Sequence, residues 1–213
     1  MRRKPKLESR IKRCGHLIVT EPERFAGQWL EEFSTGEAEY NKLHIELGCG
    51  KGIFTVEVAK NEPAVLLIGV EKISNVLVAA LELAEQEESN NVKFINRLAD
   101  DLTSFFAENE ASRIYINFCD PWPANRHAKR RLTGQRFLEM YKIVLQPEGE
   151  IHFKTDNRQL FEFSLVELEN YGFSLSEITY NLHENGPVGI MTDYEKKFHE
   201  QGIKINRCVA KVN

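Results

Sequence analysis

The hydrophobic positions of this chain change period repeatedly from residue 43 onward, which predicts alternating strands and helices. Residues 65–70 form an unbroken apolar run bounded by Pro63 and Glu71, as expected of a buried parallel strand. Short apolar segments predict further strands at 43–47, 92–95, 113–118, 150–154, 173–180 and 203–212. Helical spacing of apolar positions predicts helices at 25–33, 53–60, 76–86, 137–145 and 160–171.

This order of elements predicts an α/β fold with a mostly parallel, seven-stranded sheet and helices on both faces. We expect the last two strands to form a closing antiparallel pair. The main domain should span residues 41–213, preceded by a basic segment with a short helix at residues 1–40. Ligands of such folds bind at the carboxyl ends of the strands, so the candidate loops follow residues 47, 70, 95, 118 and 154.

The charge of the chain is unevenly distributed, although its sum is small. The 213 residues include 28 Lys and Arg against 32 Asp and Glu, a formal net charge of −4. Seven basic residues and one acid fall within residues 1–13, and a second basic cluster spans residues 126–131. Such clusters bind polyanions through their local field even when the whole chain is acidic. The same pattern would arise if residues 1–13 were a solvated tail and residues 126–131 the solvated start of a helix. Charge alone therefore leaves both polyanion binding and simple solvation open.

The same sequence argues against several classes of protein. The longest apolar stretch, residues 64–70, is far shorter than the ~20 residues that a membrane helix needs. The first residues lack the apolar segment of a signal peptide. The four cysteines are widely spaced and form no C-x-x-C pair, which disfavours a disulfide scaffold or a cysteine zinc site. We therefore expect a cytoplasmic protein without a membrane or metal partner.

A glycine-rich loop follows the first predicted strand of the main domain. Residues 46–52 read E-L-G-C-G-K-G, so that Glu46 precedes Gly48, Gly50 and Gly52. Glycines at a strand-to-helix turn let the backbone approach a ligand closely, and the helix that follows favours anionic groups. The run resembles the E/D-x-G-x-G-x-G loop of class I S-adenosylmethionine (SAM) methyltransferases. An ordinary tight turn is the alternative.

Two further loops could complete a nucleoside site. Glu71 ends the strand at 65–70, where an acid can accept hydrogen bonds from both ribose hydroxyls; alternatively, it caps the helix that begins nearby. After the strand at 92–95, an acid or a backbone N–H can meet the adenine edge. Asp100 and Asp101 lie there, and both could equally cap the next helix.

The loop after residue 118 is the most specific feature of the sequence. Residues 117–132 read N-F-C-D-P-W-P-A-N-R-H-A-K-R-R-L. Two prolines restrict the backbone directly after a buried strand and hold Asp120 at its carboxyl end. Trp122 offers a surface for base stacking, and the basic run beside it can hold phosphates. The alternative is a rigid loop with a buried Trp122 and solvated arginines.

This loop resembles the D-P-W-P-x-x-R-H-x-K-R-R-L signature of bacterial tRNA (guanine-N7-)-methyltransferases. Residues 152–157 (H-F-K-T-D-N) and 190–195 (I-M-T-D-Y-E) are similar to two further segments of that family. Residues 27–29 (G-Q-W) lie where the family has G-K/R-W. The resemblance covers approximately residues 20–210, which is nearly the whole chain.

The resemblance implies a Rossmann-like class I methyltransferase that transfers the methyl group of SAM to N7 of a guanine in the variable loop of tRNA. Together with the residues above, it assigns catalysis to Asp120 and cofactor binding to Glu46, Gly48, Gly50, Gly52, Glu71, Leu98, Asp100 and Asp120. It assigns substrate binding to Trp122, Arg126, His127, Lys129, Arg130, Arg131, Asp156, Thr192, Asp193, Tyr194 and Glu195.

Three positions depart from the family pattern. Ala124 stands where the family usually has Lys. Leu98 aligns with the family's acid after the third strand, so either Asp100 replaces that acid or only the backbone of Leu98 contacts adenine. Asp193 replaces a Glu and is one methylene shorter. These departures concern substrate and adenine binding, not the reaction class.

Two other functions are consistent with the sequence. The methyl group could go to another nucleophile, such as a protein or a free nucleotide. From a different class, the chain could be a non-catalytic RNA-binding module that keeps a vestigial methyltransferase fold. The sequence leaves open whether the chain is a monomer or a homodimer, and which tRNAs it modifies.

Overall fold

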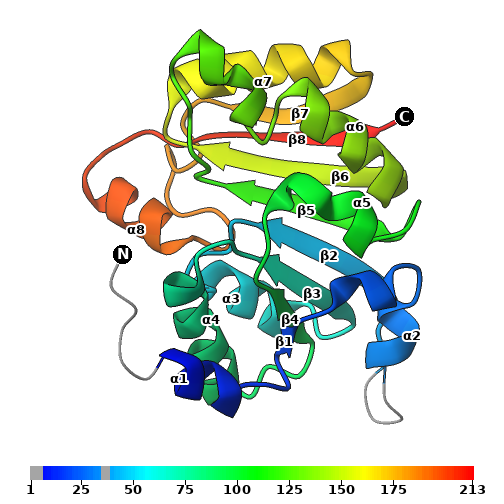
Figure 1. The fold of residues 1–213 in the computed structure, drawn as a ribbon. Coiled ribbons are helices and arrows are strands. Elements are labelled where there is room, and N and C mark those ends of the chain that lie inside the picture. Colours follow the sequence, from blue (N-terminus) through cyan, green and yellow to red (C-terminus); the bar gives the residue numbers. More distant parts are fainter. Residues whose placement is uncertain (1–6, 35–38) are drawn as a thin grey trace. The chain divides into compact units, whose positions relative to one another are not determined.

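Four parallel strands organise the first part of the chain. The computed structural model describes residues 7–34 and 39–213, which divide into a unit ending at Phe106 and a unit beginning at Ala107 (Figure 1). The strands of the first unit lie in the order β1-β4-β3-β2, and neighbouring strands are parallel. They are β1 (Ile18–Val19), β2 (Lys42–Leu47), β3 (Val65–Val70) and β4 (Val92–Ile95). Every residue of β3 is buried, so both faces of this strand are covered.

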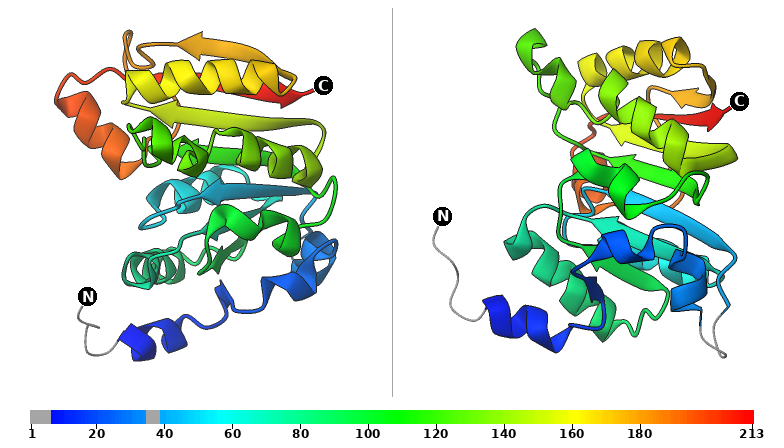
Figure 2. Two further views of the ribbon diagram at one scale, coloured as in Figure 1. Left: turned by 45° about the horizontal axis from the view of Figure 1, so that its top comes forward. Right: turned by 45° about the vertical axis from the view of Figure 1, so that its right-hand side comes forward.

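Two helices connect the consecutive strands β2, β3 and β4. They are α3 (Ile53–Asn61) and α4 (Ser74–Gln86), which contact each other and pack against β3 and β4 (Figure 2). Because the three strands are parallel, the loops that follow them emerge at one edge. The glycine loop, Glu71 and the segment after β4 are therefore neighbours, as the sequence predicts.

A buried tryptophan joins three short helices of the first unit. The single helix predicted at 25–33 is wrong, because the chain turns at Gly27 (φ +83°) and forms η1 (Pro22–Phe25) and α2 (Trp29–Phe33) instead. Trp29 is fully buried, and its Nε1 donates to the carbonyl of Phe105 at 2.8 Å, in α5 (Leu102–Phe105). Three phenylalanine rings surround the indole. Trp29 of the G-Q-W motif thus belongs to the core of this unit.

Part of the basic N-terminal segment is a helix, α1 (Leu7–Arg13), that packs on α4. The guanidinium of Arg10 donates two hydrogen bonds to the carboxylate of Glu82 on α4, one of them at 2.7 Å, and Arg13 reaches the same carboxylate at 3.4 Å. Arg10 and Arg13 therefore form ion pairs within the protein. The basic residues before position 7 lie outside the described residues, and their predicted contact with RNA stays a prediction.

The second unit also contains four strands, in the order β5-β6-β8-β7. They are β5 (Ala111–Asn117), β6 (Leu145–Thr155), β7 (Phe173–Thr179) and β8 (Asn206–Val212). β5 and β6 are parallel, whereas β8 pairs antiparallel with both β6 and β7. The predicted closing antiparallel pair is confirmed.

Two long helices cover one face of these strands, and two shorter ones carry candidate substrate residues. The long helices, α6 (Gln135–Val144) and α7 (Arg158–Asn170), lie on the same face of the second unit (Figure 2). The shorter ones are η3 (Asn125–Arg130) and α8 (Asp193–Glu200). Because β5 and β6 are parallel, the loops that carry Asp120 and Asp156 leave the same edge of this unit.

The structure differs from the predicted elements where the hydrophobic pattern is weak. The described residues form eight strands rather than seven, because the two-residue β1 pairs with β4. β6 begins at Leu145 rather than Glu150, and its register with β5 shifts between Ala111 and Arg113. The shift accommodates Pro147, since a strand tolerates proline at such an irregularity. The domain division predicted at residue 40 stays a prediction.

Candidate active site

The loop after β2 gives the backbone room for a ligand. Gly48, Gly50 and Gly52 have φ values of +76°, +59° and +76°, which glycine adopts without strain. A Cβ added at Gly48 would meet no atom within 4 Å, so the backbone there faces open space. A Cβ added at Gly52 would lie 2.6 Å from the Cβ of Ala80 on α4. The loop is therefore open at its start and closely packed against α4 at its end.

The buried carboxylate of Glu71, directly after β3, is tied to this loop. Its Oε2 accepts from the backbone N–H of Gly50 at 3.2 Å, and its Oε1 accepts from the N–H of Ile73 at 2.8 Å. Asn96, after β4, donates to the carbonyl of Glu71 and accepts from the hydroxyl of Ser74, both at 2.7 Å. Asn96 was not predicted, although it is a short polar side chain directly after a buried strand. Side-chain hydrogen bonds thus join the ends of β3 and β4.

Two buried carboxylates, those of Glu46 and Glu71, lie at this edge of the first unit. Glu46, near the end of β2, is 2% exposed and accepts a hydrogen bond from the hydroxyl of Thr55 on α3 at 2.5 Å. Burial raises the pKa of the Cys49 thiol well above its ordinary value, and the carboxylates of Glu46 and Glu71 raise it further. The thiol therefore stays neutral at physiological pH. A cationic ligand is favoured at such an edge.

The segment after β4 contains both predicted adenine contacts. Leu98 is exposed, and Asp100 is half-buried in η2 (Ala99–Asp101). Ile73, in the loop after β3, is a second large apolar side chain exposed in this unit. Exposed apolar side chains at the ligand-binding edge can cover the face of a base. Either Leu98 or Asp100 can serve as the adenine contact, and both stay predictions.

In the second unit, the loop after β5 has a strained backbone that Arg131 holds in place. Phe118 and Trp122 have φ values of +51° and +43°, which residues with a Cβ rarely adopt. Arg131 is 5% exposed; its Nε donates to the carbonyl of Pro121 at 3.2 Å, and its Nη2 to that of Trp122 at 3.0 Å. The guanidinium also lies over the ring of Phe163 on α7, 4.3 Å from its centroid. Arg131 was predicted to hold phosphate, but its donors face the loop.

Asp120 and Asp156 follow the parallel strands β5 and β6, and both side chains are exposed. Between β5 and Asp120, burial and the Asp120 carboxylate raise the pKa of the Cys119 thiol to about 12. This thiol is protonated at neutral pH and cannot act as a thiolate nucleophile. The exposed carboxylates of Asp120 and Asp156 are therefore candidates at this edge for a contact with the substrate.

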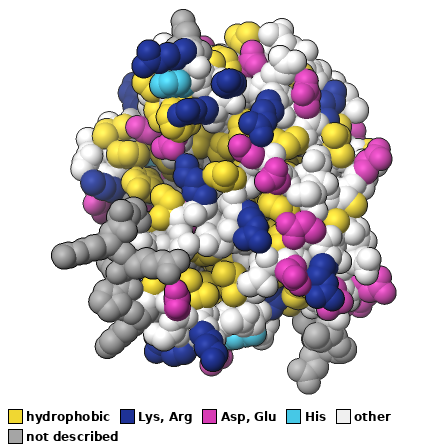
Figure 3. Space-filling view, viewed as in Figure 1, with side chains coloured by type: hydrophobic (Ala, Val, Ile, Leu, Met, Phe, Trp, Pro, Cys, Tyr) yellow, Lys and Arg dark blue, Asp and Glu magenta, His cyan; other side chains and the backbone are white. Residues whose placement is uncertain are grey.

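Basic side chains gather over η3, at the upper left of Figure 3. Arg126, Lys129 and Arg130 are exposed. The guanidinium of Arg130 lies 4.8 Å from the centroid of the Trp122 ring, and the ring of His127 meets the same indole edge-on at 5.8 Å. An aromatic face beside several cations is suited to a base and its phosphates. The structure thus brings these predicted substrate residues together.

The four predicted substrate residues at 192–195 divide into a buried pair and an exposed pair. Thr192 caps α8, because its hydroxyl accepts from the N–H of Glu195 at 3.0 Å while the Glu195 carboxylate accepts from the N–H of Thr192 at 3.2 Å. Both of these residues are buried. Asp193 and Tyr194 lie between them and are exposed, Tyr194 by 63%.

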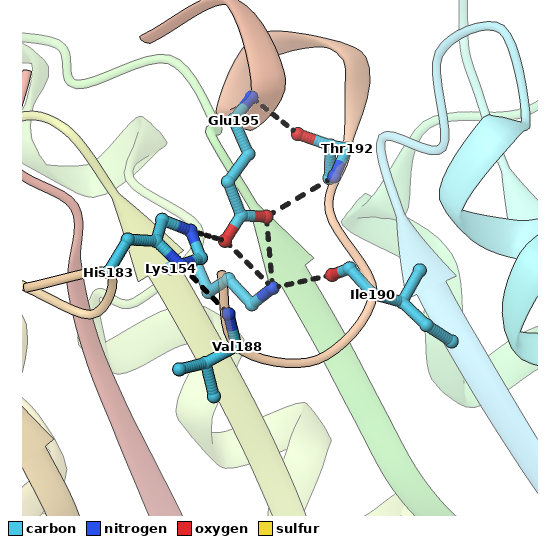
Figure 4. Close-up of polar contacts among 6 residues, drawn as sticks. All are labelled: Lys154, His183, Val188, Ile190, Thr192 and Glu195. Carbon is cyan, nitrogen blue, oxygen red and sulfur yellow. Dashed lines mark hydrogen bonds and ion pairs between the residues drawn. The ribbon is translucent and has the colours of Figure 1, made fainter. Parts of the chain in front are cut away.

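Two buried partners of Glu195 were not predicted (Figure 4). They are Lys154, near the end of β6, and His183, in the segment after β7. A lysine near the end of the predicted strand at 150–154 was a signal that could have revealed the first. No comparable sequence signal marks His183, because its surroundings depend on the path of a loop.

The comparison with known families decides the class of protein. A family model described as "Putative methyltransferase" matches residues 40–208, which is most of the chain. The chain belongs to this methyltransferase family. Its α/β fold and the ligand-binding edge described above agree with that membership.

Solved methyltransferases share the fold at low sequence identity. The aminoglycoside resistance methyltransferase NpmB1 superposes with a TM-score of 0.62 at 18% identity, covering 88% of this chain and 93% of that one. The 16S rRNA methyltransferase KamB gives 0.64 at 12%, covering 86% and 92%. A 16S rRNA adenine-N1-methyltransferase from Catenulisporales acidiphilia, solved with its cosubstrate SAM, gives 0.60 at 11%, covering 86% and 91%. The predicted Rossmann-like class I methyltransferase fold is confirmed.

SAM is the cofactor of this methyltransferase, and the first unit has residues that fit it. When bound, SAM supplies a methyl group on a positively charged sulfur. The open backbone at Gly48 leaves room for such a ligand, and the buried carboxylates of Glu46 and Glu71 favour its charge. The Glu71 carboxylate is also held in place by two backbone N–H groups, so it is ordered before any ribose hydroxyl arrives.

We expect Glu71→Ala to weaken SAM binding by roughly 1–3 kcal/mol, because charge-assisted hydrogen bonds to the ribose are lost. Isothermal titration calorimetry of the folded variant measures this change. Glu57→Ala, which removes an exposed carboxylate of α3, is the matched control and should bind SAM normally. Unchanged affinity in a folded Glu71→Ala protein would limit Glu71 to ordering the glycine loop.

Three further features of the described residues bear on the predicted partners. No helix among them is both long enough and apolar enough to cross a membrane. They contain no group of three or more His, Cys, Asp or Glu residues arranged to hold a metal ion. The four cysteines are all free thiols.

Proposed function

We propose that this methyltransferase transfers a methyl group to N7 of a guanine in the variable loop of tRNA. Family membership supports methyl transfer, and the solved methyltransferases named for 16S rRNA support an RNA substrate. The loop after β5 is the observation that supports guanine N7 of tRNA as the target. It combines the exposed acid Asp120 with Trp122 and the cations of η3, in the signature typical of tRNA (guanine-N7-)-methyltransferases.

Methyl transfer to guanine N7 requires orientation and charge stabilisation rather than a strong base. Guanine N7 has a free lone pair in the ring plane, so no proton has to leave before it attacks. The protein must hold N7 in line with the methyl group and tolerate the positive charge that passes to the guanine. The exposed carboxylates of Asp120 and Asp156 suit that charge. A carboxylate can also accept hydrogen bonds from N1–H and the 2-amino group of guanine.

A guanine inside folded tRNA must be turned out of its stack before it can react. Trp122, with the guanidinium of Arg130 over its ring, offers a face on which a base can stack. The cations of η3 can neutralise the phosphates beside it. Ala124 is exposed where the family usually has Lys, and the exposed Arg126 is a cation near enough in sequence to replace it. A tRNA substrate also supports the expected cytoplasmic location.

We expect the double variant Lys129→Gln/Arg130→Gln to bind tRNA more weakly and with a flatter salt dependence. If each side chain neutralises one phosphate, the slope of log K against log[salt] should fall by about 2. Filter binding between about 50 and 200 mM salt measures this slope. The affinity for SAM should not change. Lys60→Gln, which removes an exposed cation of the first unit, is the control and should keep the wild-type salt slope. An unchanged slope would mean that Lys129 and Arg130 only solvate the surface.

One assay tests the proposed reaction directly. The protein is incubated with methyl-labelled SAM and unmodified tRNA, and the tRNA is then digested for nucleoside analysis. We expect the label in 7-methylguanosine from the variable loop, and none with heat-inactivated protein. Label in another nucleoside, or only in protein or free nucleotides, would move the proposal to a different nucleophile. Binding of tRNA without any binding of SAM would favour a non-catalytic RNA-binding module.

A further inference from the structure

A closed network of buried charges joins β6 to the segment before α8 (Figure 4). Lys154 Nζ has three N–H donors, and it meets both carboxylate oxygens of Glu195, at 3.1 and 3.0 Å, and the carbonyl of Ile190 at 2.9 Å. Glu195 is fully buried, and its carboxylate also accepts from His183 Nε2 at 2.9 Å and from the N–H of Thr192 at 3.2 Å. Each oxygen of Glu195 thus accepts two hydrogen bonds, which fills its capacity.

The imidazole of His183 extends the network to the backbone of Val188. Its Nδ1 accepts from the N–H of Val188 at 3.1 Å, and its Nε2 faces the carboxylate of Glu195. His183 is itself buried. The network therefore holds the backbone at three positions, 188, 190 and 192, just before α8 begins.

The segment fixed in this way is otherwise poorly packed. Val188 is 47% exposed, and Asp193 and Tyr194 are exposed at the start of α8. Apolar burial therefore contributes little to its path, and the polar network determines it. The ring of Tyr194 lies 6.5 Å from that of Phe118, which directly precedes the loop that carries Asp120. Tyr194 is thus held beside this loop within the second unit, and Asp193 is its neighbour in the chain.

We propose that Lys154, Glu195 and His183 are positioning residues, and that they hold segment 188–195 so that Asp193 and Tyr194 face the target guanosine. This inference rests on the proposed function, because it concerns how the same substrate is held. It assigns the substrate contact to the exposed pair and removes it from Glu195.

The competing interpretation, implied by the family resemblance, is that Glu195 itself contacts the guanine. Its carboxylate would then have to give up four hydrogen bonds, two of them from the ammonium of Lys154 in a buried site. Removing one partner of a buried ion pair is strongly destabilising. Asp193 and Tyr194 can reach a ligand without such a cost, since both are already exposed.

Amide hydrogen exchange in the full-length, ligand-free protein tests the anchoring. We expect Lys154→Met and Glu195→Gln to speed exchange at the amides of Val188 and Thr192 by about tenfold or more, since each breaks a buried hydrogen-bond network. Two variants of His183 separate its two nitrogens. His183→Asn keeps an acceptor for the Val188 amide, whereas His183→Gln keeps only a donor toward Glu195. Protection at Val188 should therefore survive in the Asn variant and be lost in the Gln variant.

Methylation of tRNA by the same variants tests the positioning role. We expect kcat/KM for tRNA to fall in step with the loss of amide protection, while the Kd for SAM stays at the wild-type value. The double variant Lys154→Met/Glu195→Gln should be no worse than the worse single variant, because both act through one network. Glu200→Gln, which alters an exposed carboxylate of α8, is the control and should match the wild type in both experiments.

Two results would overturn the proposal. If Glu195→Gln abolishes methyl transfer while both amides stay protected, Glu195 contacts the substrate directly. If protection is lost and kcat/KM for tRNA is unchanged, the network only stabilises the fold. A wild-type protein that fails to methylate tRNA would instead refute the proposed function. The exchange rates would still confirm or overturn the anchoring in that case.

Discussion

Replacing Asp120 with Asn should lower the single-turnover rate of methyl transfer to tRNA by roughly 10²–10³-fold, the scale of one lost electrostatic stabiliser. The substitution keeps the shape of the side chain but removes its charge and replaces one acceptor oxygen with a donor. Asp120 is exposed in the loop that follows β5, so its carboxylate can face a guanine that becomes positively charged. Rapid-quench methylation at saturating SAM and tRNA measures the rate. Glu184→Gln, another exposed acid of the second unit, is the control.

The pH dependence of the same single-turnover rate shows whether the attacking atom has to lose a proton. We expect a nearly flat wild-type profile from about pH 6 to pH 8, because N7 loses no proton in the chemical step. A rate that rises tenfold per pH unit would show that deprotonation limits the reaction. The target would then be an exocyclic amine or another protonated nucleophile. A full-rate Asp120→Asn enzyme would shift the reaction-centre acid to Asp156.

The sequence predicts those parts of the fold in which burial dominates. Residues 65–70 and 92–95 are strands with the predicted bounds, because the apolar side chains of both segments are buried. The loop motifs were also informative. The glycine loop and Glu71 lie at one edge of the first unit, and Asp120 and Asp156 at one edge of the second, because parallel strands bring the loops at their carboxyl ends together.

Other features could not be predicted because they depend on contacts between distant residues. The two-residue β1 exists only through its pairing with β4. Helix α8 reads D-Y-E-K-K-F-H-E, in which apolar residues are too few to give a clear pattern, and it begins at a capping box. The cluster of Lys154, His183 and Glu195 is assembled from β6, a loop and α8. Position in the family motif suggested a substrate contact for Glu195, and only its burial indicates an anchoring role.

Replacing Arg131 with Met should reduce the rate of methyl transfer on the order of 10²-fold at saturating tRNA, without changing the affinity for SAM. The guanidinium donates to the carbonyls of Pro121 and Trp122 and thereby holds a loop whose Trp122 has a left-handed backbone. Without these bonds the loop can relax toward ordinary dihedral angles and move Asp120. A displacement of about 1 Å at a reacting group can cost 10²-fold in rate. Arg131→Lys should be intermediate, because one ammonium replaces a planar fork of donors.

Arg130→Met is the matched control. Arg130 is the exposed neighbour of Arg131 and lies over the Trp122 ring, whereas the hydrogen bonds to the carbonyls of Pro121 and Trp122 come from Arg131. We expect it to weaken tRNA binding, through one lost phosphate contact and one lost cation–π contact, but to keep the rate at saturation. The emission of Trp122 should shift in Arg131→Met, since the loop that carries the indole is released. If Arg131→Met kept the saturating rate and instead lowered the salt slope of tRNA binding by about 1, Arg131 would bind a phosphate, as the sequence predicts.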